Sequence, residues 1–210
     1  MSCVTGNAVS IWKGAIYMES VFAVIVGVGL AASCGFRVFV PMLVVSAATN
    51  ASYVEVGEGF DWIGTRTAFV AFAVASAIES AAYYVPYLDN LLDIIASPVG
   101  VIAGVVVFAA YVSGFDPFLQ WSLAVIAGGG SAAVVQGGTV VIRAASTTTT
   151  GGLANFSVST LETVAGFFFS VMSIVVPLLT IILLLVVTGC MYYIGRPILR
   201  TLFSRRGKVK

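Results

Sequence analysis

Long stretches without charge alternate with short polar segments along this chain. Four stretches of more than 20 residues carry at most one charged side chain each: residues 20–54, 94–115, 117–142 and 163–195. A bilayer core tolerates few charges and is crossed by about 20 helical residues. The pattern therefore predicts membrane-spanning helices at residues 20–48, 66–86, 94–114, 118–146 and 159–195.

Glycine and proline residues predict interruptions or ends in three of these helices. Gly35 allows a close backbone approach and Pro41 removes a backbone donor, so the first helix is easily broken between them. Gly151 and Gly152 follow the fourth helix, where glycine commonly ends a helix. Pro177 interrupts the last segment, which is either one kinked span or two shorter ones.

Composition places the chain among integral membrane proteins. Of its 210 residues, 60% are hydrophobic and 9% are charged, and the mean hydropathy is +1.07. Soluble domains average about 25% charged residues. The length accommodates an all-α, polytopic transmembrane helix bundle of about five or six spans, with no room for a soluble domain. Too little polar surface is left to bind a nucleotide or a nucleic acid.

Residue types disfavour several kinds of chemistry. The chain has no histidine, and its three cysteines are widely spaced: Cys3, Cys34 and Cys190. This pattern predicts unpaired thiols, no metal site and no cofactor. An enzyme is the least expected class, because acid–base catalysis would rest on a few carboxylates that are not obviously close together.

The two ends of the chain differ from its apolar middle. Residues 1–17 look like a leader that is dispensable for folding, residues 18–195 form a single transmembrane domain, and residues 196–210 form a basic tail. The tail carries six of the ten basic residues, so the positive-inside rule predicts a cytoplasmic C-terminus. Apolar residues between the basic ones would also let the tail lie along anionic lipid headgroups.

Two segments of the chain resemble each other. Residues 24–32 and 125–133 share a glycine-rich apolar pattern, and each block continues through a glycine into a polar end, at residues 46–50 and 146–150. The two repeats predicted in this way are residues 20–114 and 118–195. If the first crosses the membrane three times, the second enters from the opposite face. An inverted repeat with interrupted helices is typical of many transporters.

Arg37 and Glu79 are charged residues expected at membrane depth. Arg37 lies at the predicted helix interruption, and an arginine at such depth normally faces a partner, a cavity or an anion. Glu79 lies about four turns into the helix that begins near Arg66. Two interpretations of Arg37 stay open: a structural ion pair with Glu79 or Asp93, and a site for a substrate or ion.

Further polar residues near the span ends complete the candidate pathway. They are Asp89, Asp93, Gln136, Arg143, Thr147, Thr149, Thr150 and Glu162. The two aspartates, one turn apart, could hold a cation or simply face solvent. The threonines could line a polar path or satisfy a helix end capped by Gly151. Gln136 is more typical of an interhelical hydrogen bond, and Glu162 suits the N-terminal dipole of the last helix.

Several short motifs together resemble one bacterial membrane family. They are Met18-Glu19 followed by Gly27-x-Gly29-Leu30-Ala31-Ala32, Gly35-Phe36-Arg37-x-Phe39-x-Pro41, Glu79 with Pro86 and Asp89-x-x-x-Asp93, Arg143-x-x-Ser146-Thr147-x-Thr149-Thr150-Gly151-Gly152-x-x-Asn155, and Ser159-x-x-Glu162. Over residues 18–190 the chain resembles the family called domain of unknown function 4126. The resemblance implies a multi-pass protein of the cell inner membrane and brings no activity with it. Tyr83-Tyr84, Gln136 and Thr139 stand where relatives often carry charged residues or histidine, so we expect no mechanism that needs those groups.

Two function classes follow from these features. The leading hypothesis is a small transporter or channel for an ion or a small polar solute, with an anion favoured by Arg37 and the hydroxyl groups. The alternative is a non-transporting scaffold or partner subunit that binds another protein or lipid. The lipid bilayer and anionic lipid at the tail are the expected partners. Small-residue faces such as that of Gly100 and Gly104 serve packing within the chain or a homo-oligomer equally well.

Overall fold

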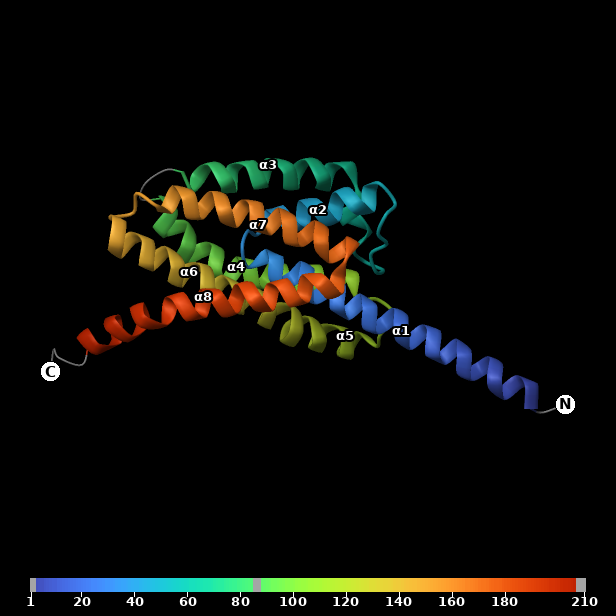
Figure 1. The fold of residues 1–210 in the computed structure, drawn as a ribbon. Helices are drawn as coiled ribbons and strands as arrows, with labels where there is room; N and C mark the ends of the chain where they lie inside the picture. The colour runs from blue at the N-terminus through green and yellow to red at the C-terminus, as the bar shows by residue number, and fades with distance from the viewer. Residues whose placement is uncertain (1–2, 85–87, 207–210) are drawn as a thin grey trace.

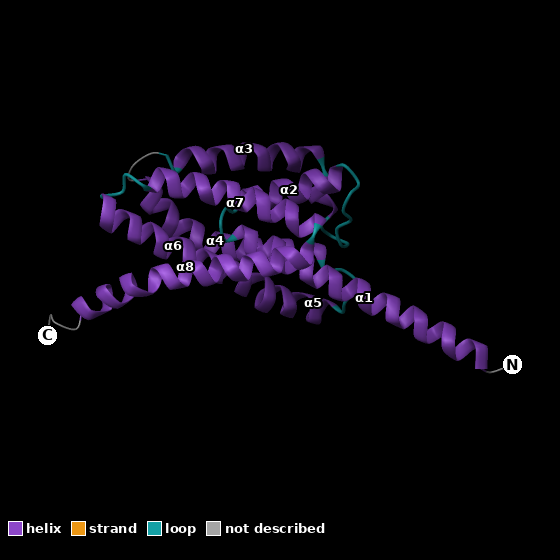
Figure 2. Cartoon of the chain, in the orientation of Figure 1, coloured by secondary structure: helices purple, strands orange, loops and turns teal. Residues whose placement is uncertain are grey.

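The chain folds into a helical bundle. In this computed structural model the backbone is described at residues 3–84 and 88–206, and the side chains at residues 19–84 and 94–196. All regular elements of this part are helical (Figure 2). They are α1 (Cys3–Cys34), α2 (Phe39–Asn50), η1 (Asp61–Gly64), α3 (Arg66–Ala82), α4 (Leu88–Tyr111), α5 (Pro117–Leu123), η2 (Ala124–Gly129), α6 (Gly130–Thr150), α7 (Asn155–Val175) and α8 (Pro177–Arg206).

Four segments among the described residues are long and apolar enough to cross a membrane. They are Ile94–Tyr111, Pro117–Thr150, Asn155–Val175 and Pro177–Arg196. Glu19–Cys34 and Phe39–Asn50 are shorter apolar helices, and the 17-residue α3 packs mainly against α2 (Figure 1). The protein is therefore an all-helical integral membrane protein of the predicted type.

The residues of the first predicted helix, 20–48, belong to two helices, α1 and α2, that run in opposite directions (Figure 1). α1 ends at Cys34 and runs antiparallel to α4, whereas α2 begins at Phe39 and runs antiparallel to α3. An added Cβ at Gly35 would lie 2.5 Å from the carbonyl oxygen of Ala132 in α6. The chain therefore turns back inside the bundle, at a point where only glycine fits against α6.

Proline and glycine mark the other interruptions. Pro41 lies in the first turn of α2, where a missing N–H leaves no helical hydrogen bond unmade. Gly151, with φ of 65°, and Gly152, with φ of 91°, end α6 in the left-handed region. α7 ends at Val175 and α8 begins at Pro177, and the two helices run in opposite directions (Figure 1). The last predicted segment is therefore two helices rather than one kinked helix.

The two similar blocks flank α4 and run in the same direction. Gly27 and Gly128 occupy equivalent places in the blocks, and an added Cβ at either would meet the ring or side-chain stem of Phe108, at 3.1 Å and 2.6 Å respectively. An added Cβ at Gly104, one turn earlier in α4, would meet the carbonyl oxygens of both Ala31 and Gly128. The expectation that the second block enters from the opposite face is therefore not supported.

The polar ends of the two blocks nevertheless lie at opposite ends of the bundle (Figure 1). The first block turns back after Cys34, so α2 returns toward the end from which α1 entered. The second block continues through η2 and α6 to Thr150 without a matching break. η2 is a single π-helical segment, a local feature that the predicted helix at 118–146 did not include.

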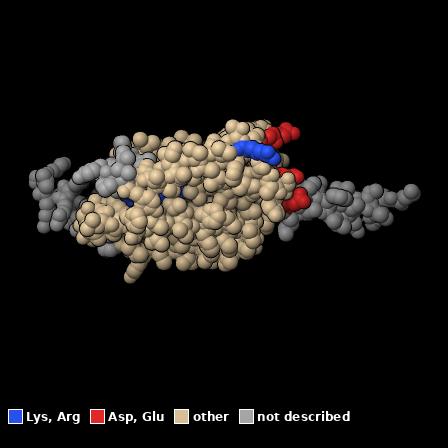
Figure 3. Space-filling model, turned by 90° about the horizontal axis from the view of Figure 1, so that it is seen from above, with Lys and Arg blue, Asp and Glu red and all other residues tan. Residues whose placement is uncertain are grey.

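The outer surface of the bundle is largely apolar. Large side chains such as Leu161, Phe167 and Leu185 are mostly exposed, as suits contact with lipid tails. In Figure 3 the acidic side chains that are visible gather at the end of the bundle nearer the N-terminus. The long side that faces the viewer in Figure 3 shows few charges, and Arg37, Glu79, Arg143 and Glu162 are buried.

Candidate functional site

Four charged side chains from different parts of the chain are buried inside the bundle. Arg37 comes from the α1–α2 connection, Glu79 from α3, Arg143 from α6 and Glu162 from α7. Each is at most 7% exposed. Together these four groups carry no net formal charge. Because uncompensated charge is costly in a membrane interior, their mutual arrangement decides what the site can do.

Arg37 lies across the first half of α7. Its Nε donates a hydrogen bond to Thr163 Oγ1 at 3.0 Å, and its Nη2 donates to the carbonyl oxygen of Ser159 at 2.9 Å and to the Ser159 hydroxyl. Gly166 leaves room for the arginine stem, since an added Cβ there would lie 3.5 Å from Arg37 Cβ. The remaining guanidinium nitrogen, Nη1, is buried without a hydrogen-bond partner. Arg37 therefore retains one unused donor group inside the protein.

Glu162 lies between the two arginines. Arg143 Nε donates to Glu162 Oε1 at 3.0 Å, and Arg143 Nη2 donates to Glu162 Oε2, which gives a two-point contact. The same Oε2 lies 3.7 Å from Arg37 Nη2. Two-point arginine–carboxylate contacts are strong and fix the plane of both groups. Glu162 is therefore held firmly by Arg143 and only loosely by Arg37.

Both guanidinium groups lie against the aromatic ring of Tyr83. Arg37 Cζ lies 3.9 Å from the ring centroid and Arg143 Cζ lies 4.1 Å from it. Tyr83 directly follows α3 as its C-cap and is 6% exposed. Cation–π contact with a ring stabilises a guanidinium most where water is excluded. Tyr83 thus stabilises both cations.

Glu79 stabilises the start of α2 rather than pairing with Arg37. Its Oε1 accepts from the backbone N–H of Val38 at 2.9 Å, and its Oε2 accepts from Phe39 at 3.1 Å. The first N–H groups of a helix have no partner within the helix, and a carboxylate there also interacts favourably with the helix dipole. Arg37 has its ion-pair contact with Glu162 instead. Of the two partners expected for Arg37, Glu79 serves a different group and the side chain of Asp93 lies outside the described residues.

The threonine run after Arg143 is engaged in local hydrogen bonds. Thr149 and Thr150 donate to the carbonyl oxygens of Ala145 and Ser146, at 2.8 Å and 2.7 Å. Thr147 Oγ1 accepts from the Asn155 side chain at 3.1 Å. These contacts match the simpler interpretation, in which the hydroxyls satisfy a helix end, and the run does not join the buried charges.

The other candidate residues fall outside the charged cluster. Gln136 donates through Nε2 to Ser97 Oγ at 3.3 Å, which links α6 to α4 as expected for an interhelical hydrogen bond. Asp89 and Asp93 belong to the first turns of α4, but their side chains lie outside the described residues. Among the residues whose side chains are described, no group of three acidic, cysteine or histidine side chains is placed to hold a metal ion.

Three residues of the cluster were not among the sequence-predicted site residues: Tyr83, Ser159 and Thr163. Glu162 was expected at a helix start, but it lies two turns inside α7 and contacts Arg143. A signal for this pair exists in the sequence. Residues equally far from the turn of a helical hairpin lie level with each other, and Arg143 and Glu162 are nearly equidistant from Gly152. The pair therefore lies about 10 Å from the α6–α7 turn.

Comparison with known proteins identifies the family of this chain. Residues 24–196 match the model of the family described as a domain of unknown function, DUF4126. No curated protein and no solved structure matches the chain. The matched region includes all four buried charges and both halves of the interrupted helix. The chain therefore belongs to the domain of unknown function 4126 family.

Proposed function

We propose that this protein is a transporter for a small anionic solute, and that Arg37 contributes directly to the anion site. The observation that carries the proposal is the unused Nη1 of Arg37, a buried donor on a cation placed at a helix break. Broken helices in transporters commonly bring charged or backbone groups to a substrate near mid-membrane. In this fold the break lies beside the first two turns of α6, and Arg37 reaches Thr163 near the middle of α7.

Energetics supports a functional interpretation of the cluster. Replacing a buried ion pair with apolar residues is often neutral or stabilising, so stability alone is a weak reason for two arginines in a membrane interior. Ionisable residues within membrane segments typically mark substrate or ion pathways. The planar donor groups of arginine fit a small anion such as a carboxylate or phosphate.

The geometry favours one sequence of contacts during binding. Glu162 is in contact with Arg143 at two points, whereas it lies 3.7 Å from Arg37. An incoming anion would therefore replace Glu162 at Arg37 first and leave the Arg143 pair intact. Glu79 already occupies the backbone donors at the start of α2. On this proposal Glu79 and Glu162 both occupy positions that suit an anion, and the incoming anion displaces only Glu162, from Arg37.

Charge at the two ends of the bundle supports a cytoplasmic C-terminus, as the sequence predicts. Glu55, Glu58 and Asp61 precede α3, and Asp116 precedes α5, at the end of the bundle where α1 enters (Figure 3). Arg196 lies toward the opposite end, and five further basic residues follow it in the sequence. The positive-inside rule assigns the basic end to the cytoplasm. We propose that the chain lies in an inner membrane in this orientation.

Single-cysteine labelling tests this orientation. In a variant without the three native cysteines, Tyr53→Cys and Leu153→Cys place thiols at opposite ends of the bundle, because Tyr53 is 84% and Leu153 is 87% exposed. We expect an impermeant maleimide to label Tyr53→Cys in intact cells and Leu153→Cys only after lysis. The reverse pattern, or labelling of both in intact cells, would overturn the proposed orientation.

Uptake into proteoliposomes tests the transport proposal. The probes are radiolabelled acetate, lactate, inorganic phosphate and sulfate, each supplied alone. We expect saturable uptake of at least one probe, and Arg37→Gln should lower it by about 10- to 100-fold, which is the usual contribution of a charge-assisted hydrogen bond. Arg66→Gln is the matched control, since Arg66 is exposed at the start of α3.

A second variant separates loss of binding from loss of folding. Thr163→Val removes the hydroxyl that accepts from Arg37 Nε but retains the guanidinium. We expect it to raise the anion concentration needed for half-maximal uptake while the protein still elutes as a single species. If the folded wild-type protein takes up none of the four probes, the proposal fails and a non-transporting partner of protein or lipid becomes the better interpretation.

A further inference from the structure

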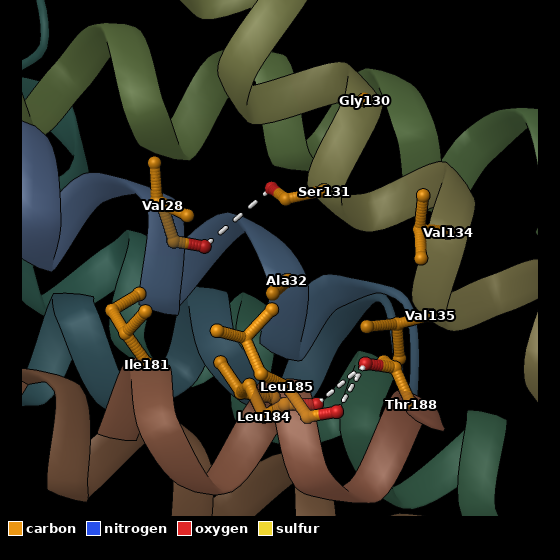
Figure 4. A pocket seen from close by; sticks show the side chains of 10 residues that line it. All are labelled: Val28, Ala32, Gly130, Ser131, Val134, Val135, Ile181, Leu184, Leu185 and Thr188. Atoms are coloured by element: carbon orange, nitrogen blue, oxygen red, sulfur yellow. Dashed lines mark hydrogen bonds between the residues drawn. The ribbon is translucent and has the colours of Figure 1, made fainter. Parts of the chain in front are cut away.

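An apolar hollow lies between α1, α6 and α8, and none of the four buried charged residues lines it (Figure 4). Its volume is about 250 Å³, and its walls include Val28 and Ala32 of α1, Val135 of α6 and Leu184 of α8. Gly130 forms part of the α6 wall, and an added Cβ there would meet nothing within 4 Å. The hollow therefore arises partly because α6 carries no side chain at that point.

A second hollow continues the first between α6 and α8. It has a volume of about 220 Å³ and shares Val134 and Thr188 with the first. Gly137, Gly138 and Gly195 contribute to its walls. We call the two hollows together the α6–α8 groove. Along α8 the groove extends from Ile181 to Gly195, or about 21 Å of helix, which exceeds the roughly 15 Å of half a bilayer core.

The chemistry of the groove favours a hydrocarbon occupant. The two hydroxyl side chains of the first hollow already donate to backbone oxygens: Ser131 to Gly128 at 3.0 Å and Thr188 to Leu184 at 2.7 Å (Figure 4 draws the second). The other lining residues of that hollow are glycine, alanine, valine, leucine and isoleucine. A polar ligand would leave its own groups unsatisfied there, whereas an alkyl chain would fill the space at no such cost.

Charge at one end of the groove identifies the kind of lipid. Gly195 forms the groove wall next to the exposed Arg196, and the sequence then continues into five more basic residues. We propose that the α6–α8 groove binds one acyl chain of an anionic phospholipid whose headgroup lies at Arg196. The lipid site is independent of transport, because the groove and the charged cluster use different residues.

Photo-crosslinking tests the proposal with a defined probe. Purified protein is placed in phosphatidylcholine vesicles that contain a small fraction of phosphatidylglycerol with a diazirine on its acyl chain. After illumination, we expect labelled peptides to contain the groove residues of α6 and α8. Gly137→Leu should lower this labelling by about tenfold, which corresponds to loss of burial for about two methylene groups.

Two further variants complete the test. Gly189→Leu is the matched control: Gly189 also lies in α8, an added Cβ there would meet nothing within 4 Å, and the residue is outside the groove. We expect unchanged labelling with this variant. Arg196→Gln should reduce the preference for phosphatidylglycerol over an equivalent phosphatidylcholine probe. Equal labelling of Gly137→Leu and Gly189→Leu would overturn the proposal, as would a dimer that Gly137→Leu dissociates, because a second copy would then occupy the groove.

Discussion

Replacement of Glu162 by leucine is expected to lower the free energy of unfolding by about 3–5 kcal/mol, the usual cost of breaking a buried ion pair from one side. Glu162 accepts at two points from Arg143 and lies 3.7 Å from Arg37. Leucine supplies no acceptor for either arginine. The buried cluster would keep Arg37 and Arg143 but lose one of its two carboxylates. Water has little access to this site, so it cannot solvate the uncompensated positive charge.

Unfolding in mixed micelles, followed by circular dichroism, measures this effect. The matched control is Glu58→Leu, because Glu58 is exposed in the segment before α3 and should change stability by no more than about 0.5 kcal/mol. The double variant Arg143→Met with Glu162→Leu removes both members of the pair. It should recover most of the lost stability, since apolar residues of similar volume often replace a buried pair without loss. A single variant as stable as the control would show that the pair is not buried as described.

The sequence predicts the local features of this fold well, because their causes are local. The uncharged stretches anticipate the spans, and the turn at Gly35 lies where glycine and a nearby proline weaken the first helix. Gly151 ends α6 with a positive φ, as glycine at a helix end commonly does. Pro177 separates two helices, although the sequence also allowed one kinked helix. Each of these outcomes depends on a few neighbouring residues.

Partners across the bundle are harder to predict, because they depend on how distant helices pack. The sequence offers Glu79 and Asp93 as partners for Arg37. Among the described side chains, Arg37 has its ion-pair contact with Glu162, while Glu79 accepts from the backbone at the start of α2. An isolated sequence reveals depth and charge but not which face of each helix points inward. The sequence does not reveal the contact of the Tyr83 ring with both arginines for the same reason.

The similarity between residues 24–32 and 125–133 predicts close helix packing but not the direction in which the two segments run. The glycines of the two blocks were interpreted as evidence for an inverted repeat. In the fold they bring both blocks close to the same residues of α4, from two sides and in the same direction. A shared pattern of small residues indicates that a neighbouring helix packs closely against the segment. Parallel and antiparallel neighbours can both pack in this way, so the pattern does not predict direction.

Replacement of Gly104 by alanine is the sharpest test of that packing. The new Cβ would lie 2.7 Å from Ala132 Cβ, 3.1 Å from the Gly128 carbonyl oxygen and 3.3 Å from that of Ala31. None of these atoms is the flexible end of a long side chain, so relief requires helices to move apart. We expect a loss of about 1–3 kcal/mol in unfolding free energy, the usual cost of overpacking a well-packed interior.

A compensating change makes this prediction specific to the α4 contacts. Adding Ala132→Gly to Gly104→Ala removes the shortest of the three contacts, so the double variant should be more stable than Gly104→Ala alone. Gly189→Ala is the control, because its Cβ would meet nothing within 4 Å. Unfolding in mixed micelles again gives the comparison. If Gly104→Ala and Gly189→Ala were equally stable, α4 would not be held closely between the two blocks, and the shared glycine pattern would need another cause.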